Sequence, residues 1–211
     1  MKILISDPVE QVCTDILTAE GFTVVNKPGI KPDELKSIIG EYDALVVRSG
    51  TQVTADIIAA GTQLKAIGRA GAGVDNINVE AATRRGVIVM NTPGGNTIST
   101  AEHTMSLMLA LARNIPQANE SLKAGKWDRK KYTGTELFGK TVGVVGLGKV
   151  GREVATRCRA FGMHVIGYDP VLSADVAARE NIEPVTLDEI YTRSDIITVH
   201  TPLNDETRNL L

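Results

Sequence analysis

The sequence feature that most constrains the fold is a set of spaced glycines between an apolar segment and a helical pattern. Residues 141–146 are apolar and β-branched, as in a buried strand, and residues 150–161 have the periodicity of an amphipathic helix. Gly146, Gly148 and Gly151 form the pattern G-x-G-x-x-G where the two segments meet. The pattern alone is weak, but a strand before it and a helix after it are the setting that a Rossmann βαβ unit requires.

Each glycine has its own physical role in such a unit. Gly146 permits the tight turn, Gly148 lets the backbone approach a pyrophosphate, and Gly151 lets the helix pack closely on its strand. The unpaired N–H groups of the first helical turn and the helix dipole then favour phosphate charge. A nucleoside-triphosphate loop is excluded, because Val150 stands where a serine or threonine should hold magnesium.

Asp169 follows the next predicted strand, residues 164–168, about 20 residues beyond the glycines, as a dinucleotide site requires. A carboxylate at this position accepts hydrogen bonds from both hydroxyls of an adenosine ribose and repels a 2′-phosphate. Pro170 and Val171 come next and offer no arginine to such a phosphate. The sequence therefore predicts NAD rather than NADP, and the alternative is a tight turn followed by a solvated aspartate.

Apolar runs and helical patterns alternate along the chain, which predicts an α/β fold with parallel sheets. In the N-terminal part the runs are continuous, as expected of strands buried on both faces. The strands expected there are residues 2–6, 22–26, 44–48, 64–68 and 87–91, and the helices are residues 9–19, 31–39, 54–60 and 79–85. They predict a doubly wound, flavodoxin-like domain over residues 1–97, which ends at the breaker-rich segment 91–96.

Residues 98–211 predict an incomplete Rossmann domain. A capping box from Ser99 to Glu102 predicts the start of a helix that runs to about residue 113 and is apolar on most sides, as in a helix buried between domains. Residues 114–139 are more polar and predict an excursion without strands. The remaining strands are expected at residues 141–146, 164–168, 182–185 and 196–200, and the helices at 150–161, 173–180 and 187–192. A complete dinucleotide fold has about six strands.

Composition excludes several classes of function. The net charge of −2 and the pI near 6.0 indicate no general attraction to nucleic acid or to an anionic membrane. No run approaches the roughly 20 apolar residues of a membrane span, and Asp7 and Pro8 end the first apolar run too early for a signal peptide. Cys13 and Cys158 lack metal-ligand spacing and are expected to be reduced thiols. We expect a cytoplasmic protein without a metal site.

The strand ends of the N-terminal domain predict a second binding region, because ligands of parallel sheets bind beyond the carboxyl ends of the strands. Arg48 and Arg69 follow two such strands, beside the glycine-rich segment 71–73. Two guanidinium groups and free backbone N–H groups suit a small anion with a carboxylate or phosphate. The alternative for each arginine is a solvated loop charge.

The sequence assigns no catalytic residue. His103, His164 and His200 have no carboxylate or nucleophile at motif spacing, and structural roles are expected for all three. We find no nucleophile triad, paired carboxylates or metal cluster in the pattern.

Several segments in combination resemble the D-2-hydroxyacid dehydrogenase family, and the resemblance covers essentially all 211 residues. They are Val47-Arg48-Ser49, Gly68-Arg69-Ala70-Gly71-Ala72-Gly73-Val74-Asp75-Asn76, Met90-Asn91-Thr92-Pro93, Gly146-Leu147-Gly148-Lys149-Val150-Gly151-Arg152-Glu153-Val154-Ala155 and Val199-His200-Thr201-Pro202-Leu203. Segments 125–131 and 134–137 narrow the resemblance to members that oxidise 3-phosphoglycerate to 3-phosphohydroxypyruvate with NAD, which opens serine synthesis.

The resemblance implies roles for particular residues. Its substrate contacts would be Arg48, Ser49, Arg69 and Gly71. Its further cofactor contacts would be the backbone of Lys149 and Val150 at the pyrophosphate, with Thr201 and Ala72 on the nicotinamide side. Ala72 departs from the family pattern, which often has threonine there, so one hydroxyl contact near the cofactor is missing.

The family's catalytic arginine, glutamate and histidine lie beyond residue 211, so none is assigned and His200 does not replace the histidine. We therefore expect this chain to bind NAD and a phosphorylated 2-hydroxy acid with negligible turnover. The resemblance also implies a homodimer formed through residues 99–139. Three alternatives stay open: a noncatalytic NAD-sensing corepressor-like protein, another 2-hydroxyacid dehydrogenase or hydroxypyruvate reductase, and a shortened chain with a structural role.

Overall fold

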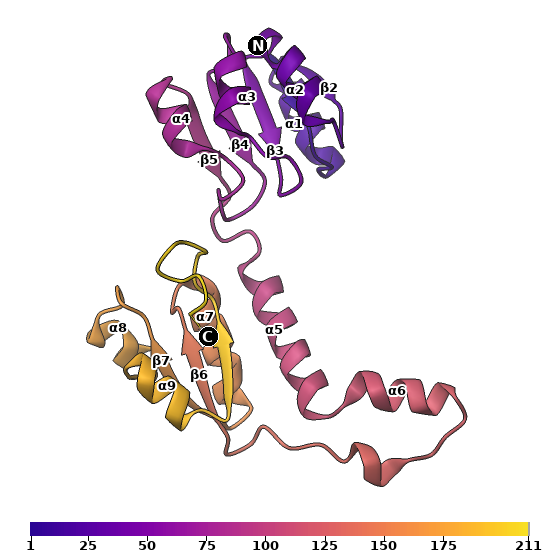
Figure 1. The fold of residues 1–211 in the computed structure, drawn as a ribbon, viewed down its shortest axis with the longest axis vertical. Coiled ribbons are helices and arrows are strands. Elements are labelled where there is room, and N and C mark those ends of the chain that lie inside the picture. The colour runs from indigo at the N-terminus through magenta and orange to yellow at the C-terminus, as the bar shows by residue number, and fades with distance from the viewer. Residues whose placement is uncertain (211) are drawn as a thin grey trace. The chain divides into compact units, whose positions relative to one another are not determined.

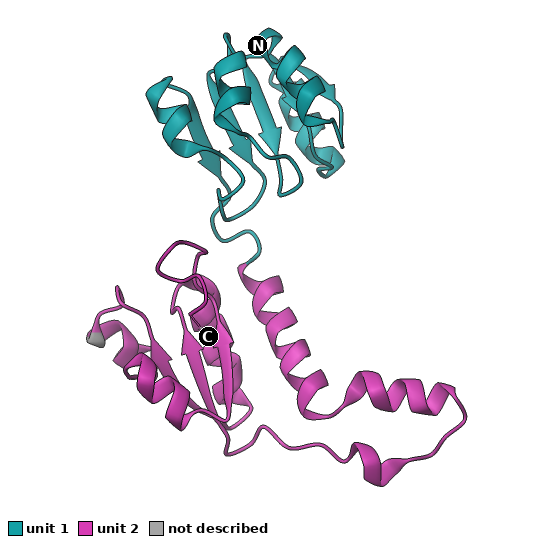
Figure 2. Cartoon of the chain, in the orientation of Figure 1, with its two compact units in different colours: residues 1–96 teal, residues 97–211 magenta. Residues whose placement is uncertain are grey.

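The computed structural model describes residues 1–210 and divides the chain into two compact units, Met1–Asn96 and Thr97–Leu211 (Figure 2). The division falls one residue before the boundary expected from the sequence. Both units are α/β, with parallel sheets (Figure 1). No helix among the described residues is long and apolar enough to cross a membrane.

The first unit is a five-stranded parallel sheet in the order β2-β1-β3-β4-β5, which is the flavodoxin-like order expected from the sequence. Its strands are β1 (Lys2–Ile5), β2 (Thr23–Asn26), β3 (Ala44–Val47), β4 (Ala66–Arg69) and β5 (Ile88–Asn91). Its helices are α1 (Gln11–Ala19), α2 (Pro32–Ile38), the 3₁₀ turn η1 (Ile39–Glu41), α3 (Ala55–Ala60) and α4 (Val79–Arg84). Each expected element is present, with ends shifted by a few residues.

The core of the first unit follows from the continuous apolar runs. Leu4, Leu45 and Ile67 pair in one row across β1, β3 and β4, and all three side chains are fully buried. Parallel strands need cover on both faces, which explains why these runs do not alternate with polar residues. The row fixes the strand register and brings the ends of β3 and β4 together.

The second unit contains a four-stranded parallel sheet in the order β8-β7-β6-β9. Its strands are β6 (Thr141–Val145), β7 (His164–Tyr168), β8 (Glu183–Pro184) and β9 (Ile196–Val199), and the helices between them are α7 (Lys149–Ala160), α8 (Ala174–Arg179) and α9 (Leu187–Arg193). This order is the 3-2-1-4 portion of the dinucleotide-binding order 3-2-1-4-5-6. The prediction of part of a Rossmann domain is confirmed.

Helix α5 (Thr97–Ala112) begins two residues before the start expected at Ser99. Asn96 directly precedes it, and asparagine is also favoured at helix N-caps. One face of α5 packs against α7 through the buried Met105 and Met108. The other apolar side chains of the helix do not all find cover in this unit, because Leu107 and Leu111 are 59% and 80% exposed.

The segment expected to be only a polar excursion contains a second helix, α6 (Ile115–Lys123), and a 3₁₀ turn, η2 (Arg129–Tyr132). Pro116 lies in the first turn of α6, where its missing N–H costs nothing. Gly125 follows the C-cap of α6 with φ 75°, as a glycine after a helix often does. Both signals are present in the sequence, but the helix was not predicted from them.

Both cysteines are free thiols. Cys158 lies in the core of the second unit, with its Sγ atom 3.6 Å from the Sδ atom of Met105. Burial raises the pKa of the Cys158 thiol to about 11, so the group is a packed, protonated side chain.

Candidate functional site

The glycine loop connects the end of β6 to the start of α7. Gly146 has φ +88°, which favours glycine, and a Cβ there would lie 2.8 Å from the carbonyl carbon and oxygen of His200. Its N–H donates to the carbonyl of Tyr168 at 2.8 Å. The turn is therefore held between the ends of β7 and β9, and only glycine fits it.

The two other glycines differ in what surrounds them. A Cβ on Gly151 would lie 2.0 Å from the carbonyl oxygen of Gly146, so α7 approaches the loop as closely as backbone allows. A Cβ on Gly148 would meet no atom within 4 Å. Gly148 is the N-cap of α7 and has no side chain to bond the first-turn N–H groups, which leaves the end of the helix open to a phosphate.

Asp169 lies beside this loop, directly after β7. One carboxylate oxygen accepts the N–H of Leu147 at 2.7 Å, and the other accepts those of Val171 and Leu172 at 2.9 and 3.1 Å. The carboxylate thus ties the glycine loop to the turn after β7. An ionised carboxylate has about four acceptor positions, so three backbone bonds leave capacity for a ribose hydroxyl.

A cavity of about 430 Å³ opens at these strand ends, within the size range of small-molecule sites. Its walls come from the glycine loop, from the turn after β7 and from the segment after β9: Gly146, Gly148, Tyr168, Asp169, Pro170, Val171, His200, Thr201, Pro202, Asn204, Glu206, Thr207 and Leu210. None of these described lining residues is an arginine or a lysine. The open helix end, the close glycines and the carboxylate fit NAD, and the acidic wall opposes a 2′-phosphate.

The glycines, Asp169 and Thr201 were expected here from the sequence, whereas the wall formed by residues 202–207 was not. The signal was available in the strand order, because β6 pairs with β9 and places Val199 beside Val145. Whatever follows β9 must then lie next to the glycine loop. Lys149 and Val150 form the first turn of α7 and do not line the cavity.

His200 lines the cavity, but its surroundings suit a structural role. Its ring Nε2 atom lies 2.9 Å from the hydroxyl of Thr198, and its backbone N–H donates to the carbonyl of Val145 at 2.8 Å. Burial lowers the pKa of His200, so its ring is neutral near pH 7. No group of His, Cys, Asp and Glu side chains within residues 1–210 has the arrangement of a metal site.

In the first unit, Arg48 directly follows β3 and Arg69 ends β4, the neighbouring strand. Arg48 and Ser49 are exposed. Arg69 instead turns back on its own loop: its Nη1 donates to the carbonyl of Gly73 at 2.5 Å and its Nη2 lies 3.6 Å from Asp75, with the side chain 11% exposed. Gly71 packs against this guanidinium, since a Cβ there would lie 3.3 Å from it. Arg48 is thus the freer of the two cations.

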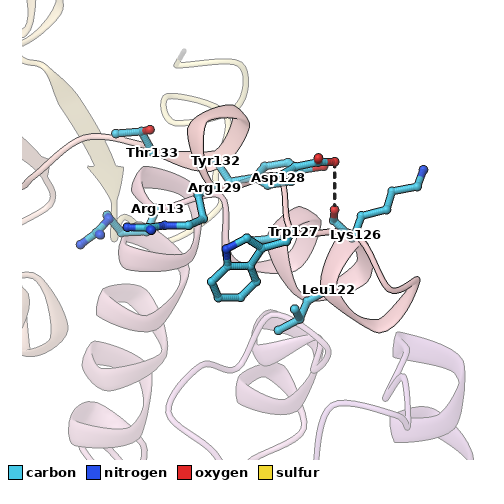
Figure 3. Close-up of a pocket in the computed structure, with 10 residues that line it drawn as sticks. Arg113, Leu122, Lys126, Trp127, Asp128, Arg129, Tyr132 and Thr133 are labelled. Atoms are coloured by element: carbon cyan, nitrogen blue, oxygen red, sulfur yellow. Dashed lines mark hydrogen bonds between the residues drawn. The ribbon is translucent and has the colours of Figure 1, made fainter.

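A second hollow, of about 400 Å³, lies between α6 and η2 (Figure 3). Trp127, 73% exposed, and Tyr132 form its aromatic wall, with Arg113 and Arg129 nearby. The hydroxyl of Ser121 lies 3.5 Å from a carboxylate oxygen of Asp128 across its floor. The hollow contains none of the residues predicted to bind ligand.

Residues 105–211 match the model of the D-isomer specific 2-hydroxyacid dehydrogenase family, NAD binding domain. The chain belongs to this family. It is 53% identical over 210 residues to D-3-phosphoglycerate dehydrogenase of Rattus norvegicus, covering 100% of this chain and 39% of that protein. It is 51% identical over 211 residues to D-3-phosphoglycerate dehydrogenase of Archaeoglobus fulgidus, covering 100% of this chain and 40% of that protein. The chain therefore spans about two fifths of the length of these curated relatives.

Solved structures agree with this assignment. The TT0316 protein of Thermus thermophilus superimposes with a TM-score of 0.91 at 30% identity, covering 100% of this chain and 68% of that one. NAD-dependent formate dehydrogenase of Staphylococcus aureus, solved with NAD, gives a TM-score of 0.87 at 27% identity, covering 100% of this chain and 68% of that one. The second unit therefore contains part of the NAD-binding domain of this family, and the family model indicates NAD as its cofactor.

Proposed function

We propose that the whole protein oxidises 3-phosphoglycerate to 3-phosphohydroxypyruvate with NAD, the step that opens serine synthesis. The observation that carries the proposal is the identity of 53% and 51% to D-3-phosphoglycerate dehydrogenases over 210 and 211 residues, a length that spans both units. Residues 1–97 are the substrate-binding domain in this proposal, and residues 98–211 are part of the NAD-binding domain.

On the cofactor side, the backbone of Gly148, Lys149 and Val150 receives the pyrophosphate at the start of α7. Asp169 accepts hydrogen bonds from the adenosine ribose, and Thr201 lines the nicotinamide side. NAD, when bound, supplies the acceptor for the hydride that leaves the substrate. The close packing of Gly146 and Gly151 keeps the loop in the conformation that binding needs.

On the substrate side, the exposed Arg48 binds an anionic group of the phosphorylated 2-hydroxy acid, with Ser49 beside it. Arg69 shapes the turn that contains Gly71 and contributes the weaker contact, since its guanidinium already binds Gly73 and Asp75. No general acid–base is assigned within residues 1–210, and we propose that the 211-residue chain binds both ligands but turns over negligibly.

The test measures NADH formation by the whole protein with NAD and 3-phosphoglycerate, and by the 211-residue chain under the same conditions. Turnover by the whole protein alone is the expected result. Reduction of hydroxypyruvate with no activity on the phosphorylated pair would overturn the proposed substrate. Equal turnover by the 211-residue chain and the whole protein would overturn the proposal that this chain binds both ligands with negligible turnover.

Arg48→Gln is expected to raise the KM for 3-phosphoglycerate about 10- to 100-fold, because a charge-assisted hydrogen bond contributes roughly 1.5–3 kcal/mol. The KM for NAD should stay within about twofold, since the substitution lies in the other unit. Arg84→Gln is the matched control: Arg84 is also an exposed arginine of the first unit, but it pairs with Glu80 on α4. An unchanged KM in Arg48→Gln would remove Arg48 from the substrate site.

We also propose a homodimer in the cytoplasm. Leu107, Leu111, Leu122 and Trp127 are exposed apolar side chains on α5, α6 and the loop after α6, and a second copy would cover them. The two free thiols suit a reducing compartment. Light scattering of the purified protein tests the dimer, and a monomer at micromolar concentration would contradict it.

A further inference from the structure

A buried polar cluster lies directly beneath the loop that carries Arg48. Asp7 follows β1, and its side chain is 5% exposed. One carboxylate oxygen accepts the backbone N–H of Arg48 at 2.6 Å and that of Thr51 at 3.0 Å. The other accepts the hydroxyl of Thr51 at 3.0 Å. One buried carboxylate therefore binds both ends of the loop formed by residues 48–51.

Asn76 binds the same two residues through their carbonyl groups. Its side-chain amide donates to the carbonyl of Arg48 at 2.7 Å and to that of Thr51 at 2.6 Å, and the residue is 4% exposed. Arg48 and Thr51 thus have both backbone N–H and C=O satisfied by two buried side chains. Residues 7 and 76 are far apart in the sequence, so the loop is clamped by separate parts of the unit.

The clamp leaves little freedom to the loop between its ends. A Cβ on Gly50 would lie 2.7 Å from the carboxylate of Asp7, so the backbone rests directly on that group. Next to the loop, Val53 forms a parallel bridge with Ile77, and its N–H donates to the carbonyl of Asn76 at 2.8 Å. The side chains of Arg48 and Ser49 are exposed, and the Nη1 of Arg48 donates to the carbonyl of Pro8 at 3.3 Å.

We propose that Asp7 and Asn76 are positioning residues for substrate binding, which hold residues 48–51 so that Arg48 and the backbone of Ser49 meet an anionic group of the substrate. The inference rests on the proposed function, because it takes Arg48 as a substrate contact. A buried carboxylate costs several kcal/mol of desolvation, and stability alone is served as well by apolar packing. The hydrogen bonds of the Asp7 carboxylate go to Arg48 and Thr51, so they fix the conformation of this loop. Apolar side chains in the same place would not bond the loop's backbone.

The first test is Asp7→Asn in the whole protein, which replaces an acceptor oxygen by an amide that faces N–H donors. We expect the KM for 3-phosphoglycerate to rise about tenfold or more, with kcat and the KM for NAD within about twofold, as charge-assisted bonds to the loop are lost. A merely structural role would lower the melting temperature and the active fraction, and so the apparent kcat, without moving the KM. That result overturns the proposal.

Two further variants keep the test decisive. Thr51→Val removes the hydroxyl's bonds to Asp7 and to Ser6 but keeps the backbone bonds to Asp7; it is expected to fold and to raise the KM about threefold, less than Asp7→Asn. Asp43→Asn is the matched control, because Asp43 also accepts a backbone N–H, from Lys2 at 2.8 Å, but lies before β3 rather than after it. It should lower the melting temperature and leave the KM unchanged.

A double-mutant cycle separates positioning from general damage. If Asp7 acts through the loop of residues 48–51, then Asp7→Asn combined with Arg48→Gln raises the KM by clearly less than the product of the two single effects. Multiplicative effects on the KM would overturn the proposal while leaving the proposed function intact. A wild-type protein that neither turns over nor binds 3-phosphoglycerate in calorimetric titration overturns both.

Discussion

Replacing Gly151 by alanine is expected to abolish NAD binding, because the added methyl group would lie 2.0 Å from the carbonyl oxygen of Gly146. That oxygen belongs to the backbone of the turn at Gly146, which lies against the backbone of His200 at the end of β9. Relief requires α7 to shift away from β6, which disrupts both the glycine loop and the core beneath it. Overpacking typically costs about 1–3 kcal/mol, and a clash with backbone lies at or above that range.

The measurement pairs calorimetric titration of NAD with thermal unfolding. Gly151→Ala should show no detectable heat of binding and a melting temperature lower by roughly 6 °C or more, since 3 kcal/mol shifts a chain of this size by about that amount. Gly148→Ala is the matched control, because a Cβ there meets no atom within 4 Å. It should fold like the wild type and bind NAD about tenfold more weakly, since the methyl group narrows the approach to the pyrophosphate.

The comparison between the two alanines is what makes this prediction specific. If Gly151→Ala retained NAD affinity within about threefold of the wild type, helix α7 would tolerate displacement and the close approach would not matter for binding. If Gly148→Ala failed to fold, the conclusion that a methyl group fits at this position without a clash would be wrong.

The glycine loop and Asp169 were predictable because their chemistry is local. The turn, the helix start and the following strand lie within 30 residues, and each requires a particular residue type at a fixed spacing. The strands of both sheets were predictable for a similar reason, since a strand buried on both faces must be a continuous apolar run. The strand order came from the fold class that the alternating strands and helices indicate, not from the apolar runs themselves.

Other features depend on contacts that the sequence does not display. Asp7 and Asn76 look like ordinary turn residues until β1, β3 and the loop before α4 come together. Arg69 was expected to face a ligand, but its own loop provides closer partners. Helix α5 was expected to be buried because it is apolar, yet apolar content does not say how many faces find a partner.

Asp169→Asn is expected to weaken NAD binding about 10- to 100-fold and to reduce the preference for NAD over NADP by a similar factor. The substitution removes a charge-assisted bond to the ribose, worth roughly 1.5–3 kcal/mol, and the charge that repels a 2′-phosphate. The asparagine also places an amide group where, in the wild type, a carboxylate oxygen accepts the N–H of Leu147 at 2.7 Å. Titration of both dinucleotides, with the melting temperature recorded alongside, measures the two effects.

Asp195→Asn is the control for loss of a backbone-bound carboxylate in the same unit. Asp195 accepts the N–H of Thr141 at 2.8 Å, before β6, and this bond lowers the pKa of its carboxyl group. The substitution should therefore reduce stability at neutral pH without changing affinity for either dinucleotide. If Asp169→Asn weakened NAD and NADP equally, Asp169 would not select the cofactor. Selection would then pass to Glu206, the other carboxylate in the cavity wall, and Glu206→Gln would be the variant that admits NADP.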